Sequence, residues 1–113
     1  MQLFKNLFGG GEPTNVTAQE AQAQLKGDNP PFLLDVRQKA EFKSGHIPKA
    51  KLITLNELPN RLDELPKDRT ILCVCQSGSR SGMARRQLAK AGFDVLNLRG
   101  GMIAWQRAGL PVK

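Results

Sequence analysis

The sequence predicts an α/β fold, in which an open, mostly parallel sheet of five strands carries helices on both faces. Two observations lead to this prediction. Short apolar runs of strand length alternate with segments of helical period along the 113 residues. The connections between the apolar runs are too long for tight hairpins, so successive strands are expected to lie parallel. The length suits one domain with one core.

The predicted domain begins after a glycine-rich joint at residues 9–13. Before this joint, residues 3–8 carry apolar side chains four positions apart, which fits either two helical turns or a frayed tail. We therefore expect an amino-terminal extension over 1–13 and the domain itself over 14–113.

A capping-box pattern marks the first helix of the domain. Thr17 and Glu20 occupy the two ends of this pattern, so a helix is expected over about 18–26, with Gly27 placed to end it. A very short strand is expected just before it, at 15–16.

The other elements follow from apolar runs and from turn residues. Strands are expected where short apolar runs are bounded by proline, glycine or polar residues, at 32–36, 51–55, 71–74 and 95–98. Helices are expected between them and after the last strand, at 38–44, within 56–62, at 80–91 and at about 102–107.

Positive charge is concentrated in the second half of the chain, whose net charge is +7. Residues 1–68 hold nine acidic and nine basic side chains, whereas 69–113 hold eight basic side chains and one acidic. The few aromatic residues form no stacking or groove-reading motif, so nucleic acid is not expected as a partner. A field that concentrates small anions fits this charge better, and a solvated basic helix face is the alternative.

No apolar run approaches the ~18 residues of a membrane-spanning helix, so no membrane partner is expected. The first residues are too short and too polar for a signal peptide, and we expect a cytoplasmic location. The spacing of Cys73 and Cys75 suits neither a disulfide framework nor a zinc site, so both thiols are expected to be free. Cys73 is expected to be a small buried hydrophobe, with a strained bridge between the two cysteines as the alternative.

The candidate site is the turn that carries Cys75. This cysteine follows the predicted strand at 71–74 and precedes the predicted helix at 80–91, so its thiol is placed where unpaired N–H groups favour an anion. Such a position lowers the pKa of a thiol, and the thiolate is the nucleophile. Gly78 relieves steric crowding at the tightest point of the turn. A buried cysteine before an ordinary helix cap is the alternative.

Three separated patterns resemble the rhodanese family of sulfurtransferases, over about residues 14–113. They are Leu34–Arg37 with Glu41–Phe42 and Gly45–Pro48, then the cysteine loop, then Leu98–Gly101 with Trp105 and Gly109–Pro111. The resemblance implies the rhodanese-like α/β fold and sulfur transfer through a persulfide on Cys75. Phosphatases of similar topology need an arginine at position 81, which is Ser81 here, so a phosphatase or arsenate reductase is not expected.

The mechanism implied by the resemblance is a double displacement. The Cys75 thiolate takes a sulfane sulfur from thiosulfate or a persulfide donor, and cyanide or a thiol then removes it. No metal, nucleotide or organic cofactor is required. Arg80 is expected to bind the anionic donor, with Gln76 and Ser79 at the rim. The full set of expected substrate-binding residues is Gln76, Ser77, Gly78, Ser79, Arg80 and Ser81.

Two alternatives to this enzyme remain on the same fold. One is a non-catalytic binding or regulatory module, and the other is a sulfur-relay module with a protein donor or acceptor.

Four residues near the predicted site are expected to be structural. His46 is expected to cap or pack a turn, and Trp105 to close the core. Asp35 is expected to fix loop N–H groups, while Arg37 is expected to pair with a neighbouring acid such as Glu41.

Overall fold

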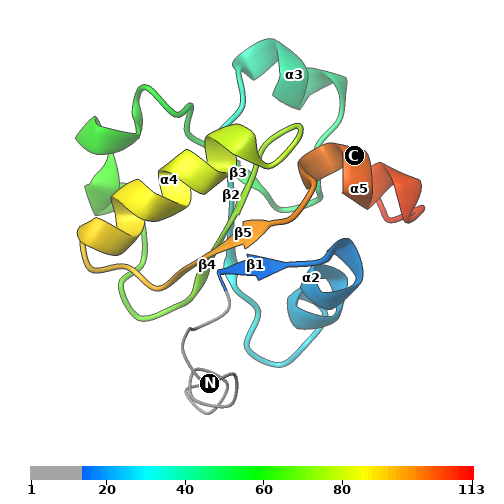
Figure 1. Ribbon diagram of the computed structural model, residues 1–113, viewed down its shortest axis with the longest axis horizontal. Helices are drawn as coiled ribbons and strands as arrows, with labels where there is room; N and C mark the ends of the chain where they lie inside the picture. The colour runs from blue at the N-terminus through cyan, green and yellow to red at the C-terminus, as the bar shows by residue number, and fades with distance from the viewer. Residues whose placement is uncertain (1–13) are drawn as a thin grey trace.

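A five-stranded, all-parallel sheet forms the centre of the computed structural model, which describes residues 14–113 (Figure 1). The strand order is β1-β5-β4-β2-β3. The strands are β1 (Asn15–Val16), β2 (Phe32–Asp35), β3 (Lys51–Leu52), β4 (Ile71–Val74) and β5 (Val95–Leu98). The predicted α/β architecture is confirmed. The extension predicted over 1–13 lies outside the described residues.

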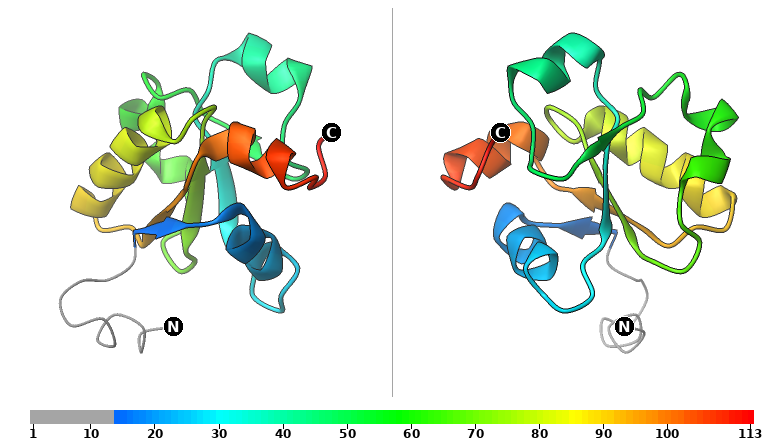
Figure 2. Two further views of the ribbon diagram at one scale, coloured as in Figure 1. Left: turned by 45° about the vertical axis from the view of Figure 1, so that its right-hand side comes forward. Right: turned by 180° about the vertical axis from the view of Figure 1, so that it is seen from behind.

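Helices cover both faces of this sheet (Figure 2). They are α2 (Ala18–Leu25), α3 (Lys39–Ser44), α4 (Ser79–Lys90) and α5 (Gly101–Arg107). Helix α4 packs on one face, whereas α2 and α5 pack together on the other. Helix α3 follows β2 and lies beyond the carboxyl ends of the strands, beside the start of α4 (Figure 1).

The edge strand β3 is shorter than predicted. It ends at Leu52, whereas the apolar run extends to Leu55. The Thr54 hydroxyl lies 2.9 Å from Asn56 Oδ1 and 3.0 Å from Glu57 Oε1. These local contacts turn the chain away from the sheet, as short polar side chains commonly do.

The helix predicted within 56–62 is replaced by two 3₁₀ turns, η1 (Leu58–Asn60) and η2 (Leu62–Glu64). Pro59 lies in the first turn of η1 and has no N–H to donate. Short 3₁₀ turns tolerate this loss better than a continuous α-helix does.

The alternation of side chains along β4 decides which face Cys75 occupies. Leu72 and Val74 join the apolar cluster beneath α2 and α5. Ile71, Cys73 and Cys75 join the cluster beneath α4. The Cys75 side chain therefore faces α4 at the point where β4 ends.

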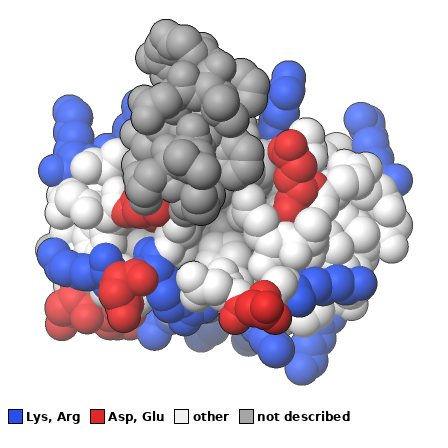
Figure 3. Space-filling model, turned by 90° about the horizontal axis from the view of Figure 1, so that it is seen from below, with Lys and Arg blue, Asp and Glu red and all other residues white. Residues whose placement is uncertain are grey.

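The surface at the amino ends of the strands, opposite this point, carries charges of both signs. Figure 3 shows Lys and Arg side chains spread around it, with Asp and Glu side chains between them. Among residues 14–113, no helix is long and apolar enough to cross a membrane.

Candidate active site

A tight loop between β4 and α4 holds the Cys75 sulfur. The backbone N–H of Gly78 donates a hydrogen bond to Cys75 Sγ at 3.1 Å. Gly78 is the N-cap of α4 and has a φ of 100°, in the left-handed region that glycine adopts without steric cost. Cys75 has no exposed surface, so its sulfur forms the floor of this cradle.

A buried side-chain network supports the sulfur from below. Ser81 Oγ lies 3.3 Å from Cys75 Sγ and 2.5 Å from Asn97 Oδ1. Asn97 Nδ2 donates to Asn15 Oδ1 at 3.0 Å and to the Gly78 carbonyl at 3.2 Å, which fixes the orientation of the Asn97 amide. The single Ser81 hydroxyl proton is therefore shared between the sulfur and the Asn97 carbonyl oxygen.

The first turn of α5 orients the backbone of the cradle. The N–H of Met102 donates to the Cys75 carbonyl at 2.9 Å, and the N–H of Ile103 donates to the Gln76 carbonyl at 3.1 Å. These N–H groups belong to the first turn of α5, where backbone N–H groups have no acceptor within the helix. The C=O and N–H of a trans peptide point in opposite directions. When α5 binds the Gln76 carbonyl, the N–H of the same peptide, which belongs to Ser77, therefore points back toward the sulfur.

The two cysteines have opposite protonation behaviour. Burial opposes ionisation of Cys75, but hydrogen bonds from the Ser81 hydroxyl and from the N–H groups of Ser81, Gly78 and Ser77 outweigh it and lower the pKa of this thiol. Burial and the nearby Cys75 raise the pKa of Cys73 to about 12. Both thiols are free, and of the two only Cys75 has the lowered pKa that favours the thiolate form.

Ser81→Ala is expected to raise the pKa of the Cys75 thiol. Removing the hydroxyl takes away the side-chain donor that favours the thiolate, whereas the Gly78 N–H remains. The rate of iodoacetamide alkylation follows the thiolate fraction, so its midpoint should move to higher pH in the variant. An unchanged midpoint would show that the backbone N–H groups alone set the pKa.

The predicted substrate-binding residues divide into two groups. Gly78 and Ser81 contact the sulfur, and the Ser77 N–H helps to lower its pKa. The side chains of Ser77 and Ser79 are exposed at the rim, and Gln76 is partly buried there. Within residues 14–113, no group of three or more His, Cys, Asp and Glu side chains is placed to hold a metal ion.

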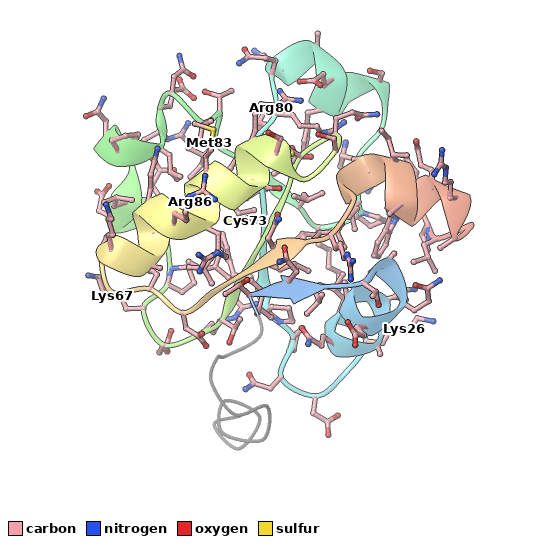
Figure 4. The ribbon with its side chains drawn as sticks, viewed as in Figure 1. Lys26, Lys67, Cys73, Arg80, Met83 and Arg86 are labelled. Atoms are coloured by element: carbon pink, nitrogen blue, oxygen red, sulfur yellow. The ribbon has the colours of Figure 1, made fainter. Side chains whose placement is uncertain are left out.

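Arg80 leaves the start of α4 and points toward α3 (Figure 4). Its guanidinium donates to both carboxylate oxygens of Glu41, with Nη1–Oε1 and Nη2–Oε2 distances of 2.7 and 2.8 Å. The pair holds the pKa of Glu41 at about 2, so this carboxylate is ionised throughout the neutral range.

Arg37 pairs with a neighbouring acid, as predicted, but the acid is Asp35 and not Glu41, the example given. Arg37 Nη2 lies 2.8 Å from Asp35 Oδ2 and also donates to the Gly45 carbonyl. Asp35 in addition accepts the Arg37 backbone N–H at 3.0 Å, which confirms that Asp35 fixes the backbone after β2. Both side chains are buried, and a buried charge needs a close partner, so the nearer carboxylate takes the guanidinium.

His46 and Trp105 have the structural roles predicted for them. His46 Nδ1 lies 2.8 Å from the Phe42 carbonyl and therefore carries the ring proton, and the two rings stack with centroids 3.7 Å apart. Trp105 is buried and donates its indole N–H to the Pro111 carbonyl at 2.8 Å.

Three further residues belong to the site although no site role was predicted for them: Asn97, Glu41 and Gly101. Asn97 has a sequence signal, because an amide within the apolar run of β5 needs a buried partner. Glu41 belongs to the first family motif, but its contact with Arg80 joins residues 39 positions apart. Gly101 allows α5 to approach the loop, since a Cβ there would lie 2.3 Å from the Cys75 carbonyl oxygen.

Comparisons with known proteins place this geometry among related chains. A family model described as the rhodanese-like domain matches residues 17–108. A sulfurtransferase of Allochromatium vinosum is 40% identical over 98 residues, which cover 86% of this chain and 92% of that protein. The putative sulfur carrier protein YrkF of Bacillus subtilis is 35% identical over 91 residues, which cover 80% of this chain and 49% of that protein.

A solved structure agrees with these matches. The crystal structure of a rhodanese-like domain protein from Staphylococcus aureus superimposes with a TM-score of 0.78 and 35% identity, covering 81% of this chain and 90% of that one. The family match at 17–108 includes every residue of the cradle.

Proposed function

The chain belongs to the rhodanese-like domain family, and from this premise we propose that it transfers sulfane sulfur through a persulfide on Cys75. The observation that carries the proposal is the cradle itself. A thiol with a lowered pKa accepts hydrogen bonds from the Gly78 N–H and the Ser81 hydroxyl at the end of a parallel strand. A lowered pKa gives a larger thiolate fraction at a given pH, and the thiolate is the attacking form.

The proposed reaction has two balanced steps. The Cys75 thiolate attacks the outer sulfur of the donor, the S–S bond of the donor breaks, and its electron pair leaves on sulfite or on a thiolate. The enzyme then holds the outer sulfur as a persulfide. An acceptor nucleophile, cyanide or a thiol, attacks that sulfur and releases the Cys75 thiolate.

The cradle acts in both steps because negative charge returns to the same place. Its N–H groups stabilise the thiolate before attack and again as the leaving group of the second step. Arg80 supplies a positive charge near the sulfur. Glu41 has the largest effect in raising the pKa of Arg80, and the charge of the Cys75 thiolate raises it further. In this proposal Arg80 contacts an anionic donor, and Gln76 and Ser79 line the rim of the site.

A sulfur-relay role on the same site has its own support. The likeness to the putative sulfur carrier YrkF, over half of that protein, fits a chain whose donor or acceptor is another protein. A non-catalytic binding module is less consistent with the site, because such a module has no need for a cradle that lowers the pKa of a thiol.

The test is the intact mass of the reduced protein before and after incubation with thiosulfate and, separately, with a thiol persulfide. We expect a gain of one sulfur atom, its removal by cyanide, and its location on the peptide that contains Cys75. If no donor adds sulfur, the binding module becomes the better function for this fold.

A further inference from the structure

The Arg80 fork, assigned above to an anionic donor, is already occupied. Both terminal nitrogens of its guanidinium donate to Glu41, at 2.7 and 2.8 Å, and each side chain is about one-third exposed. A bidentate pair of this kind uses the Nη1–Nη2 edge of the guanidinium, which could otherwise bind a thiosulfate or sulfonate group. A donor that needs this edge must therefore compete with Glu41.

Glu41 is held in place from a second direction. Its Oε1 also accepts the backbone N–H of Gln38 at 3.0 Å, in the capping box at the start of α3. The carboxylate is thus fixed between the α3 cap and Arg80, and it does not depend on Arg80 alone for its position.

Two ion pairs lie close to the cradle. From the end of β2, Asp35 is paired with Arg37, and from α3 and α4, Glu41 is paired with Arg80. The charges of Asp35 and Cys75 both act on Arg80, so these groups lie within electrostatic range of one another. Each carboxylate therefore offsets the positive charge of one of these two arginines.

We propose that Glu41 is a specificity-determining residue that makes the site favour thiol persulfides over the dianion thiosulfate. The inference rests on the proposed sulfur transfer at Cys75. Thiosulfate brings two negative charges to a site where Glu41 offsets the positive charge of Arg80, and it releases sulfite as a dianion. A persulfide RS–SH brings at most one charge, and when its S–S bond breaks the electron pair leaves on RS⁻, which takes up a proton.

Two sulfur donors of the same bond type but different charge separate the effect of donor charge from the effect of the bond that breaks. Thiosulfate and the methanethiosulfonate anion both carry an outer sulfur bonded to a sulfonyl sulfur, but they differ by one unit of charge. Glu41→Gln removes one negative charge and keeps an oxygen to cap Gln38. Because the energy scales with the donor charge, the variant should raise kcat/KM about tenfold for thiosulfate and about threefold for methanethiosulfonate.

Glu64→Gln is the matched control. Glu64 also makes a two-point contact with an arginine, Arg61, at 2.7 and 2.8 Å, and its pKa is likewise about 2. It lies on η2, outside α3 and the cysteine loop, and its substitution changes the net charge of the protein equally. Both donors should change less than about twofold in this variant, since exposed charges that lie apart are screened.

A second variant reverses the sign of the effect. Arg80→Ala removes a cation and leaves Glu41 without its arginine, so the ratio of kcat/KM for thiosulfate to that for methanethiosulfonate should fall below the parental value, and adding Glu41→Gln to Arg80→Ala should raise it again. This variant keeps the proposal testable if Glu41→Gln disturbs the α3 cap.

The outcomes separate this inference from the proposed function. Equal changes for the two donors in Glu41→Gln, or an equal ratio change in Glu64→Gln, would overturn the role of Glu41 while leaving sulfur transfer intact. A parent protein that gains sulfur from neither donor nor from a persulfide would overturn the proposed function itself. A charge-dependent ratio that rises in Glu41→Gln and falls in Arg80→Ala would support the inference.

Discussion

Cys75→Ser is expected to abolish sulfur uptake, with the rate of transfer falling on the order of 10³-fold or more, as for other catalytic nucleophiles. A hydroxyl is not deprotonated near neutral pH, and its oxygen cannot hold a sulfane sulfur as a persulfide does. The fold should survive, because serine is slightly smaller and its oxygen can accept the same hydrogen bonds from Gly78 and Ser81. Intact mass after donor treatment and thermal unfolding measure the two effects separately.

Cys73→Ala is the matched control for this substitution. Cys73 lies two residues earlier on the same face of β4, is fully buried, and has a pKa raised to about 12. Its replacement leaves a small cavity that costs about 1 kcal/mol of unfolding free energy, but sulfur uptake should continue. Sulfur uptake retained in Cys75→Ser and lost in Cys73→Ala would transfer the nucleophile to Cys73 and contradict the assignment.

The order of the elements and the place of the nucleophile follow from local patterns in the sequence. The capping box at Thr17 and Glu20 is formed as predicted, with the Thr17 hydroxyl and the Glu20 carboxylate each accepting a backbone N–H. Short, mainly apolar runs give the four-residue strands β2, β4 and β5. The family resemblance drawn from separated motifs is confirmed by the match over 17–108.

The ion pair of Arg80 could not be predicted in the same way, because it depends on a distance across the fold. Arg80 and Glu41 are 39 residues apart and meet only because α3 lies beside the start of α4. Several basic residues lie closer to Glu41 in the sequence, yet the folded chain pairs it with Arg80. The charges that surround the sulfur are therefore a property of the packed elements and not of the cysteine loop.

The contact by which α5 supports the cradle also cannot be predicted from the sequence of the loop. Helix α5 begins some 26 residues after Cys75, yet two of its N–H groups hold the loop carbonyls. A glycine pair before a predicted helix signals a tight approach of some kind. It does not say which backbone is approached, and only the packing of α5 against the loop identifies it.

Gly101→Ala is expected to damage stability and the site together. Gly101 has a φ of 57°, and an added Cβ would lie 2.3 Å from the Cys75 carbonyl oxygen and 2.6 Å from that of Gln76. Backbone strain and this clash should cost about 3 kcal/mol, which lowers the midpoint of thermal unfolding by roughly 10 to 20 °C. To relieve the clash, α5 must move away from the loop, and the Cys75 thiol should then lose part of its lowered pKa.

Gly109→Ala separates the clash from the backbone strain. Gly109 has a similar φ of 69°, but nothing lies within 4 Å of the position of its Cβ. This variant should lose only about 1 kcal/mol of stability from the left-handed backbone, with an unchanged alkylation midpoint for Cys75. If both variants lose the same stability and neither shifts the alkylation of Cys75, then contact with α5 does not hold the cradle. If only Gly101→Ala shifts it, the reactivity of Cys75 depends on α5, whose N–H groups bind the carbonyls of the loop.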